Sequence, residues 1–208
     1  MIRNIIFDLG GVIINLDTSA TMHAFQSLGM KDFGALYTQS KQAALFDDFD
    51  RGKISAGDFR NALRQHLPPE TTDAAIDAAW NAMLADIPVA RLQLLENLKT
   101  KYRIFLLSNT NEIHVTAFSA YLQRQFGFAD FSRYFEGGYY SCRIGKRKPD
   151  ADAFLHVIME HKLNPTQTLF IDDSRQHVEG ALRAGLKAAQ LKIEGGEELI
   201  SFCQKLKL

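Results

Sequence analysis

The sequence has few of the features that mark secreted, membrane-bound or nucleic-acid-binding proteins. Its two cysteines, Cys142 and Cys203, lie far apart and match no metal-binding or redox motif. Basic and acidic residues balance at 24 each, so charge favours neither nucleic acid nor an acidic membrane as a partner. No apolar run is long enough to cross a bilayer, and the N-terminus shows no signal-peptide pattern. We therefore expect a cytoplasmic protein, monomeric or, as the alternative, homodimeric.

What the sequence does contain is a set of short apolar runs that end in polar residues. The first, at 5–7, ends in Asp8 and is followed at once by two glycines; the run is too short for a helix and suits a buried strand. Two later runs, at 102–107 and 168–171, end in similar groups: Ser108, Asn109 and Thr110 after one, Asp172 and Asp173 after the other. Taken alone, Asp8 could equally be an acid that caps the next turn.

The order of strands and helices predicts an α/β fold with a doubly wound parallel sheet. Apolar strands alternate with helical stretches from residue 87 onward, and a further strand is expected at 188–193. Between 18 and 86 the pattern is helical, with helices expected at 19–28, 55–67 and 71–84 and no convincing strand. We therefore predict a core formed by residues 1–17 and 87–208, with a helical cap domain, 18–86, inserted above the site.

The polar strand ends predict a site for phosphate and a divalent cation. Ligands of open parallel sheets bind beyond the carboxyl ends of the strands, where these residues would meet. Carboxylates from two strands can hold Mg²⁺, which prefers oxygen ligands. A hydroxyl and neighbouring amides can hold phosphate oxygens, and Lys148, which opens the helix before the third strand, can neutralise charge. Two unit negative charges about 4 Å apart repel by about 4 kcal/mol at an effective dielectric of 20, so the acids need such cations.

Four motifs, in this order, resemble those of the haloacid dehalogenase (HAD) superfamily. They are Asp8-Leu9-Gly10-Gly11-Val12, Leu107-Ser108-Asn109-Thr110, Lys148-Pro149 and Ile171-Asp172-Asp173. The resemblance covers essentially the whole chain, and the inserted helices resemble the family's cap of the first type. Within that cap, Arg51-Gly52-Lys53-Ile54-Ser55 and Phe59 resemble a segment of the glucose-1-phosphate phosphatase-like branch.

The resemblance implies a role for each matching position. Asp8 would be the nucleophile, forming an aspartyl phosphate that water hydrolyses. Ser108, the Asn109 amide and Lys148 would hold the transferring phosphoryl group. The Mg²⁺ ligands would be Asp8, the backbone carbonyl of Gly10, Asp173, and Asp172 either directly or through a water. The implied activity is a HAD-like, Mg²⁺-dependent phosphatase acting on a small phosphorylated metabolite, with a sugar phosphate favoured.

Position 10 departs from the family pattern. The family's phosphatases usually carry an Asp there as general acid and base, a function that typically contributes about 10²–10⁴-fold to the rate. With Gly10 in its place, three outcomes stay open: a substrate whose leaving group needs no proton, another group that supplies the proton, or a catalytically weak binding protein. The same gap argues against a phosphomutase.

Two other classes fit the residues less well. A phospho-receiver module also uses Asp, Mg²⁺, Ser or Thr and Lys, but it places its acid pair before the phosphorylated strand and has no large lid. A dehalogenase on the same scaffold works without a metal, which would leave Asp172 and Asp173 unexplained.

The remaining polar residues have simpler interpretations. The segment 48–54 resembles a calcium loop, but its glycine comes one position early and the closing Glu is absent, so we expect a turn between cap helices. Its acids could still face substrate hydroxyls, because a cap lies over the site. We expect His114 to be a surface or packing histidine and His177 to be exposed to solvent. Lys146 and Arg147 are expected in a solvated turn, although Arg147 could attract an anionic substrate.

Overall fold

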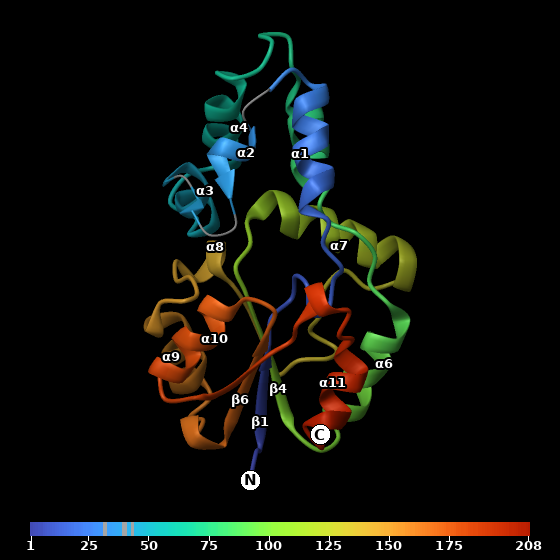
Figure 1. The fold of residues 1–208 in the computed structure, drawn as a ribbon, viewed down its shortest axis with the longest axis vertical. Coiled ribbons are helices and arrows are strands. Elements are labelled where there is room, and N and C mark those ends of the chain that lie inside the picture. The colour runs from blue at the N-terminus through green and yellow to red at the C-terminus, as the bar shows by residue number, and fades with distance from the viewer. Residues whose placement is uncertain (31–32, 39–40, 43) are drawn as a thin grey trace.

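The computed structural model describes residues 1–208 except 31–32, 39–40 and 43, and its elements form two groups (Figure 1). A parallel sheet with helices on both faces lies at the bottom of the view, and the helices formed by residues 18–81 lie above it. Among the described residues, no helix is both long and apolar enough to span a membrane.

The sheet has the strand order β5-β4-β1-β6-β7 in the described chain, and every pairing is parallel. Its strands are β1 (Asn4–Phe7), β4 (Arg103–Ser108), β5 (Gly137–Tyr140), β6 (Thr168–Asp172) and β7 (Lys187–Gln190). The central strand β1 is buried throughout, and Phe7 is in register with Leu106 of β4 and Ile171 of β6. The prediction of a doubly wound parallel sheet is confirmed.

Side-chain alternation along the strands supplies an apolar layer to each face of the sheet. On one face Ile5 and Phe7 pack with α6 (Val89–Leu98), α7 (Glu112–Phe126) and α11 (Leu199–Lys205). On the other, Ile6 and Phe105 pack with α9 (Ala151–Glu160) and α10 (Arg175–Arg183). The short α8 (Ser141–Ile144) and the 3₁₀ turns η1 (Pro165–Gln167) and η2 (Ile193–Gly195) complete this part. The last strand ends at Gln190 instead of 193, because the chain then turns into η2.

Residues 18–81 contain more elements than we expected. The helices are α1 (Thr18–Ser27), α2 (Phe33–Leu36), α3 (Ala44–Asp50), α4 (Ala56–Arg64) and α5 (Asp73–Asn81). The expectation that this part holds no strand is wrong, since β2 (Tyr37–Thr38) and β3 (Lys41–Gln42) pair in antiparallel fashion. Two residues per strand are too few to produce a readable alternation.

Aromatic residues, including Phe25, Phe46, Phe59 and Trp80, form a separate buried cluster in residues 18–81. The boundaries predicted for the cap domain, 18–86, stay a prediction.

The cap helices and their connecting segments contact the core at several places, including one pairing of backbone groups and one contact through Arg51 and Gly52. At the first, the two connecting segments run side by side: the Asn15 amide donates to the Asp86 carbonyl at 3.0 Å, and the Ala85 amide donates to the Asn15 carbonyl at 3.0 Å. At the second, the turn after α3 lies on α8 and on the segment before α9. There Arg51 Nη2 donates to Asp150 Oδ2 at 2.8 Å, and Gly52, which has a positive φ, lies against the Cys142 carbonyl.

Gly180 gives a first testable prediction. It lies in α10, where a Cβ atom would come 2.5 Å from the Pro149 carbonyl oxygen, a backbone atom that cannot easily move. We expect Gly180→Ala to lower the free energy of unfolding by about 1–3 kcal/mol, the usual cost of overpacking. Urea unfolding monitored by circular dichroism measures this change.

The matched control is Gly57→Ala in α4, where the nearest atom is an ordinary 3.5 Å away. Because alanine is the better helix former, this variant should gain up to about 1 kcal/mol. Equal effects of the two substitutions would contradict close packing of α10 on the Pro149 backbone.

Candidate active site

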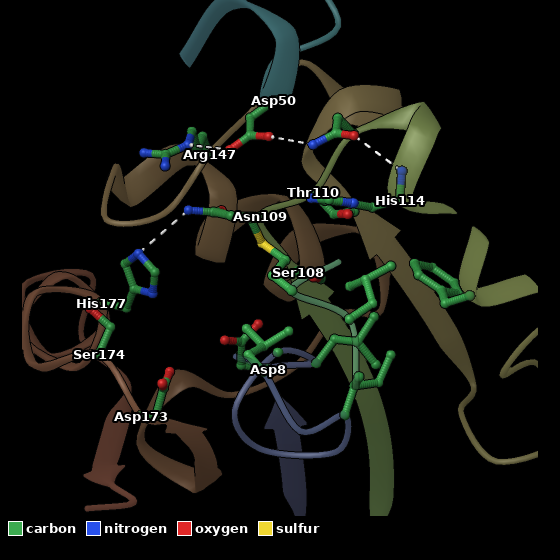
Figure 2. Close-up of a pocket in the computed structure, with 18 of the residues that line it drawn as sticks. Asp8, Asp50, Ser108, Asn109, Thr110, His114, Arg147, Asp173, Ser174 and His177 are labelled. Carbon is green, nitrogen blue, oxygen red and sulfur yellow. Dashed lines mark hydrogen bonds and ion pairs between the residues drawn. The ribbon is translucent and has the colours of Figure 1, made fainter. Parts of the chain in front are cut away.

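The polar strand ends meet at one edge of the sheet (Figure 2). Asp8 follows β1, Ser108 ends β4 and Asp172 ends β6; because β1 pairs in parallel with both neighbours, their carboxyl ends lie together. A cavity of about 130 Å³ opens there, lined by five of the predicted site residues: Asp8, Gly10, Ser108, Asn109 and Asp173. The other two, Lys148 and Asp172, are fully buried beside Asp8.

Lys148 links the acids of the two strands. Its Nζ lies 2.7 Å from Asp8 Oδ1 and 2.7 Å from Asp172 Oδ2. Asn109 holds the backbone on which this lysine is carried: its Oδ1 accepts from the Lys148 amide at 2.9 Å, and its Nδ2 donates to the Lys148 carbonyl at 2.9 Å. The Asn109 side chain therefore positions Lys148, a function that the sequence did not reveal.

The electrostatics show that the site holds more negative charge than Lys148 can balance. Burial raises the pKa of Asp8 well above its ordinary value, and repulsion from Asp172 adds to this although Lys148 opposes it. Burial, together with repulsion from Asp172, raises the pKa of Asp173 to about 7. Burial would lower the pKa of Lys148, but attraction by Asp172 and Asp8 raises it overall.

This surplus of carboxylate oxygens fits a hard divalent cation. Asp8 and Asp173 face the cavity, and the carbonyl of Gly10 belongs to the loop that lines it. Asp172 has a different setting, since its oxygens already accept from Lys148 Nζ and from the Ser174 amide. Burial opposes its ionisation, but Lys148 and His177 hold the pKa of Asp172 well below its ordinary range.

The expectation that His177 is exposed to solvent is wrong. Its side chain is 12% exposed, its Nδ1 lies 3.1 Å from both Asp172 oxygens, and its Nε2 lies 3.4 Å from Asn109 Nδ2. The reason is that α10 begins three residues after β6 ends, so its first turn lies close to the strand end. The signal in the sequence was that His177 follows Asp173 by four residues, close enough to return to the acid pair on the first turn of a helix.

The expectation that Arg147 lies in a solvated turn is also wrong. Its side chain is 14% exposed and lines the cavity. Its Nε lies 3.5 Å from Asp50 Oδ2 and its Nη1 lies 3.6 Å from Asp47 Oδ1, so it pairs with two acids of α3. Asp50 lines the cavity as well, and burial raises its pKa although Arg147 and Asn111 oppose this. The turn expected between cap helices is present after α3.

The structure also shows what occupies the space beside Gly10. A Cβ atom at this position would come 2.7 Å from Cδ1 of Leu16, which lines the same cavity. A carboxylate side chain at position 10 would therefore have to displace Leu16. The apolar leucine lies beside the position where the family's phosphatases usually carry their general acid.

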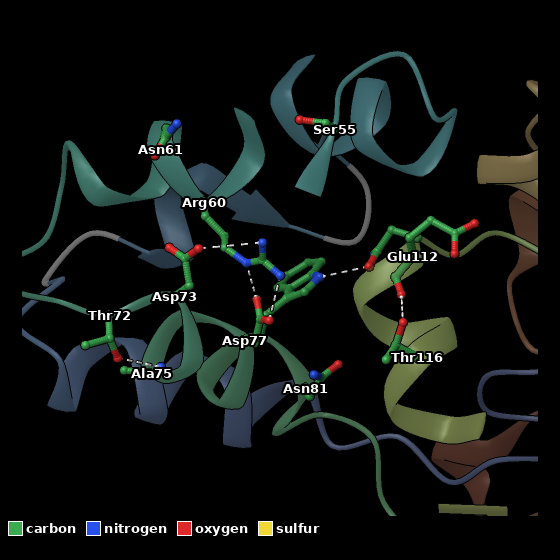
Figure 3. Close-up of polar contacts among 12 residues, drawn as sticks. Ser55, Arg60, Asn61, Thr72, Asp73, Ala75, Asp77, Asn81, Glu112 and Thr116 are labelled. Carbon is green, nitrogen blue, oxygen red and sulfur yellow. Dashed lines mark hydrogen bonds and ion pairs between the residues drawn. The ribbon is translucent and has the colours of Figure 1, made fainter. Parts of the chain in front are cut away.

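His114, expected at the surface or in packing, is a packing histidine that also lines the cavity. It is buried, its ring stacks on Trp80 at a centroid distance of 4.8 Å, and its Nδ1 lies 2.8 Å from Asn81 Oδ1. Helix α5, which carries Trp80, is fastened to α4 by Arg60, whose Nε and Nη2 donate to Asp77 at 2.8 Å each (Figure 3). These contacts fix the part of the cavity wall that the cap provides.

Both the sequence and the fold of this chain are similar to those of known proteins. Residues 2–185 match the family model described as haloacid dehalogenase-like hydrolase. D-ribitol-5-phosphate phosphatase from Bacteroides thetaiotaomicron is 29% identical over 190 residues, which cover 91% of this chain and 92% of that protein.

Two solved structures are also similar to this chain. The HAD family enzyme bt-2542 from Bacteroides thetaiotaomicron, in complex with magnesium and inorganic phosphate, is 33% identical with a TM-score of 0.81, covering 92% of this chain and 95% of that one. A predicted HAD-like family hydrolase from Porphyromonas gingivalis is 33% identical with a TM-score of 0.87, covering 99% and 98%.

The burial of His114 predicts an acid-sensitive stability. Burial lowers its pKa from the ordinary 6.5 to about 3, so below about pH 6.5 the unfolded chain takes up a proton that the folded protein does not. This contribution to stability is therefore complete above pH 6.5 and is lost as the pH falls toward 3, by up to about 1.4 kcal/mol per pH unit. We expect His114→Phe to reduce the slope of unfolding free energy between pH 6 and 4.

Urea unfolding at several pH values, with EDTA present, measures that slope. His66→Phe is the matched control, because His66 is exposed, and it should leave the slope as in the unsubstituted protein. If His114→Phe showed that same slope, the neutral, buried state of His114 would be disproved.

Proposed function

The chain belongs to the haloacid dehalogenase-like hydrolases, and on that premise we propose that it is a Mg²⁺-dependent phosphatase of a small phosphorylated metabolite that reacts through Asp8. The main support is the placement of Asp8 at the cavity with one oxygen held by Lys148. The similar phosphatase named above, and the similar enzyme bound to magnesium and phosphate, support the same reaction class.

In this proposal Asp8 attacks the phosphorus of the bound ester. A bond forms between a carboxylate oxygen and phosphorus, while the bond to the leaving oxygen breaks and its electron pair stays on that oxygen. Water then hydrolyses the aspartyl phosphate and regenerates Asp8. Ser108, the backbone amide of Asn109 and Lys148 hold the phosphoryl oxygens as their charge redistributes.

Asp8, the Gly10 carbonyl and Asp173 would hold Mg²⁺, with Asp172 supporting the site from behind. When bound, the ion supplies positive charge that screens the phosphate from the carboxylates. Asp172 keeps Lys148 and His177 in place through the contacts described above.

The organic part of the substrate is proposed to be a sugar or polyol. The named substrate of the similar phosphatase is a pentitol phosphate, which supports this choice. The alternative, a catalytically weak binding protein, rests on Gly10 and on the apolar Leu16 beside it. It predicts tight binding of a phosphate ester without turnover.

Substitution of the nucleophile tests the reaction. With Mg²⁺ and a panel of sugar, polyol and acyl phosphates, we expect turnover of at least one compound and complete loss of activity with EDTA. Asp8→Asn should lower kcat by at least about a thousandfold, as the loss of a nucleophile does in other enzymes. Phosphate release and acid-quench trapping of the phosphorylated protein are the measurements.

Asp152→Asn, at an exposed position of α9, is the matched control and should keep full activity. Chelator-insensitive activity, or a phosphoryl group trapped on the Asp8→Asn protein, would refute the mechanism. Tight binding of one compound without turnover of any would support the binding protein instead.

Removal of Asp173 tests the metal site by stability alone. In EDTA at pH 8 the ionised Asp173 destabilises the fold, because its pKa in the folded protein is raised to about 7. We therefore expect Asp173→Asn to unfold at a higher temperature than the unsubstituted protein, with a smaller difference at pH 5, where Asp173 is protonated in the folded state. Added Mg²⁺ should raise the melting temperature of the unsubstituted protein but not that of the variant.

Differential scanning fluorimetry with and without Mg²⁺ measures both effects, and Asp152→Asn again serves as the control. A Mg²⁺ response that survives in Asp173→Asn would remove this residue from the ligand set.

A further inference from the structure

The cavity has a polar wall at the end opposite the strand ends. Figure 2 shows Asp50 and Arg147 at one end and Asp8 and Asp173 at the other. The polar wall combines Asp50 from α3, Asn111 from the start of α7, and Arg147 from the segment before Lys148. Each of these residues comes from a different part of the chain, and they meet only because the cap lies on the core.

Asp50 is the centre of this wall. It is buried, which is costly for a carboxylate unless hydrogen bonds and opposite charge compensate. Asn111 Nδ2 donates to its Oδ1 at 3.1 Å, and Arg147 Nε lies 3.5 Å from its Oδ2. A carboxylate has about four acceptor sites on its two oxygens, so these contacts leave it able to accept further hydrogen bonds from a molecule in the cavity.

The cavity lining also contains apolar side chains. They are aliphatic and aromatic: Ile14, Leu16, Met83, Leu84 and Phe118. A ligand in the cavity therefore meets both hydrogen-bonding groups and hydrocarbon. Polyols and sugars suit such a lining, because they carry both hydroxyl and C–H groups.

A purely apolar ligand fits this cavity poorly. Its hydrocarbon would lie against the Asp50 carboxylate and exclude water from it, and burial of a polar group without a new hydrogen bond is unfavourable. The same group is satisfied when hydroxyls replace the lost water. The polar wall therefore favours ligands with hydroxyl groups over apolar ligands, because only the former keep the Asp50 carboxylate hydrogen-bonded.

We propose that Asp50, held by Arg147 and Asn111, is the specificity-determining residue of this enzyme and accepts hydrogen bonds from hydroxyl groups on the organic part of the substrate. This inference rests on the proposed phosphatase function. It assigns the substrate to the polyhydroxylated phosphate esters. Because Asp50 belongs to the cap and the phosphate site to the core, both ends of the substrate are recognised only when the cap is docked as in this structure.

Asp47 provides a matched control on the same helix. It lies almost one turn before Asp50, carries the same charge and pairs with the same arginine, at 3.6 Å from Arg147 Nη1. It does not belong to the cavity lining among the described residues, and its side chain is 32% exposed, against 11% for Asp50. A substitution at Asp47 therefore disturbs Arg147 without removing an acceptor from the cavity.

The experiment compares two phosphate esters of primary five-carbon alcohols, D-ribitol 5-phosphate and n-pentyl phosphate, with Mg²⁺ present. We expect the unsubstituted protein to prefer the polyol. Asp50→Ala should lower the ratio of kcat/KM for the polyol to kcat/KM for pentyl phosphate by about 10–100-fold, the value of a hydrogen bond to a charged group. Asp50→Asn, which keeps one acceptor, should show a smaller decrease, and Asp47→Asn should keep the ratio within about twofold.

The outcomes separate this inference from the function on which it rests. Equal efficiency of the unsubstituted protein on both esters overturns the inference and leaves the phosphatase in place. An equal loss on both esters in Asp50→Ala, or the same change of ratio in Asp47→Asn, shows a structural effect and also overturns it. If no phosphate ester is turned over, the proposed function itself fails, and the inference fails with it.

Discussion

The site depends on one buried ammonium group that is shared by the acids of two neighbouring strands. Lys148 Nζ contacts Asp8 and Asp172 at the same distance, so it ties the end of β1 to the end of β6. Its own position is set by the Asn109 side chain and by the close approach of α10 to Pro149 at Gly180. Residues of four segments therefore have to be correctly placed before Asp8 can present an oxygen to the cavity.

The shared ammonium also explains why the carboxylates of the site behave differently. Asp172 is next to both Lys148 and His177 and stays ionised, whereas Asp8 and Asp173 have raised pKa values because burial and their neighbours oppose a second and third negative charge. Acids that repel one another in this way favour the binding of a cation. Without one, the negative charges of the ionised site are not balanced by Lys148 alone.

The parts of the fold that the sequence predicted are those with a local signal. Apolar strand runs that end in acids identified the sheet and the neighbourhood of Asp8, and the four ordered motifs identified the residues that converge there. The sequence left open that the acids of 48–54 face substrate hydroxyls and that Arg147 attracts an anionic substrate, but it did not show that Asp50, Arg147 and Leu16 line one cavity, because their meeting depends on the docking of the helices of residues 18–81, which no local pattern encodes. His177 was judged from its place on a helix just past the acid pair and Arg147 from its basic neighbours, and polar side chains in such settings are normally solvated. The β2–β3 pair was missed because its strands are too short for a periodic signal.

The two segments that connect the cap helices to the core run side by side. Backbone hydrogen bonds join Asn15 to Ala85 and Asp86, and Leu16 and Leu84 form an antiparallel bridge next to them. The chain between β1 and β4 thus leaves and rejoins the sheet at adjacent residues. Exchange or shortening of this inserted block would leave the strand ends, the lysine and the acids with their own covalent neighbours. The covalent frame of the reacting groups is therefore independent of the block that supplies Asp50 to the cavity.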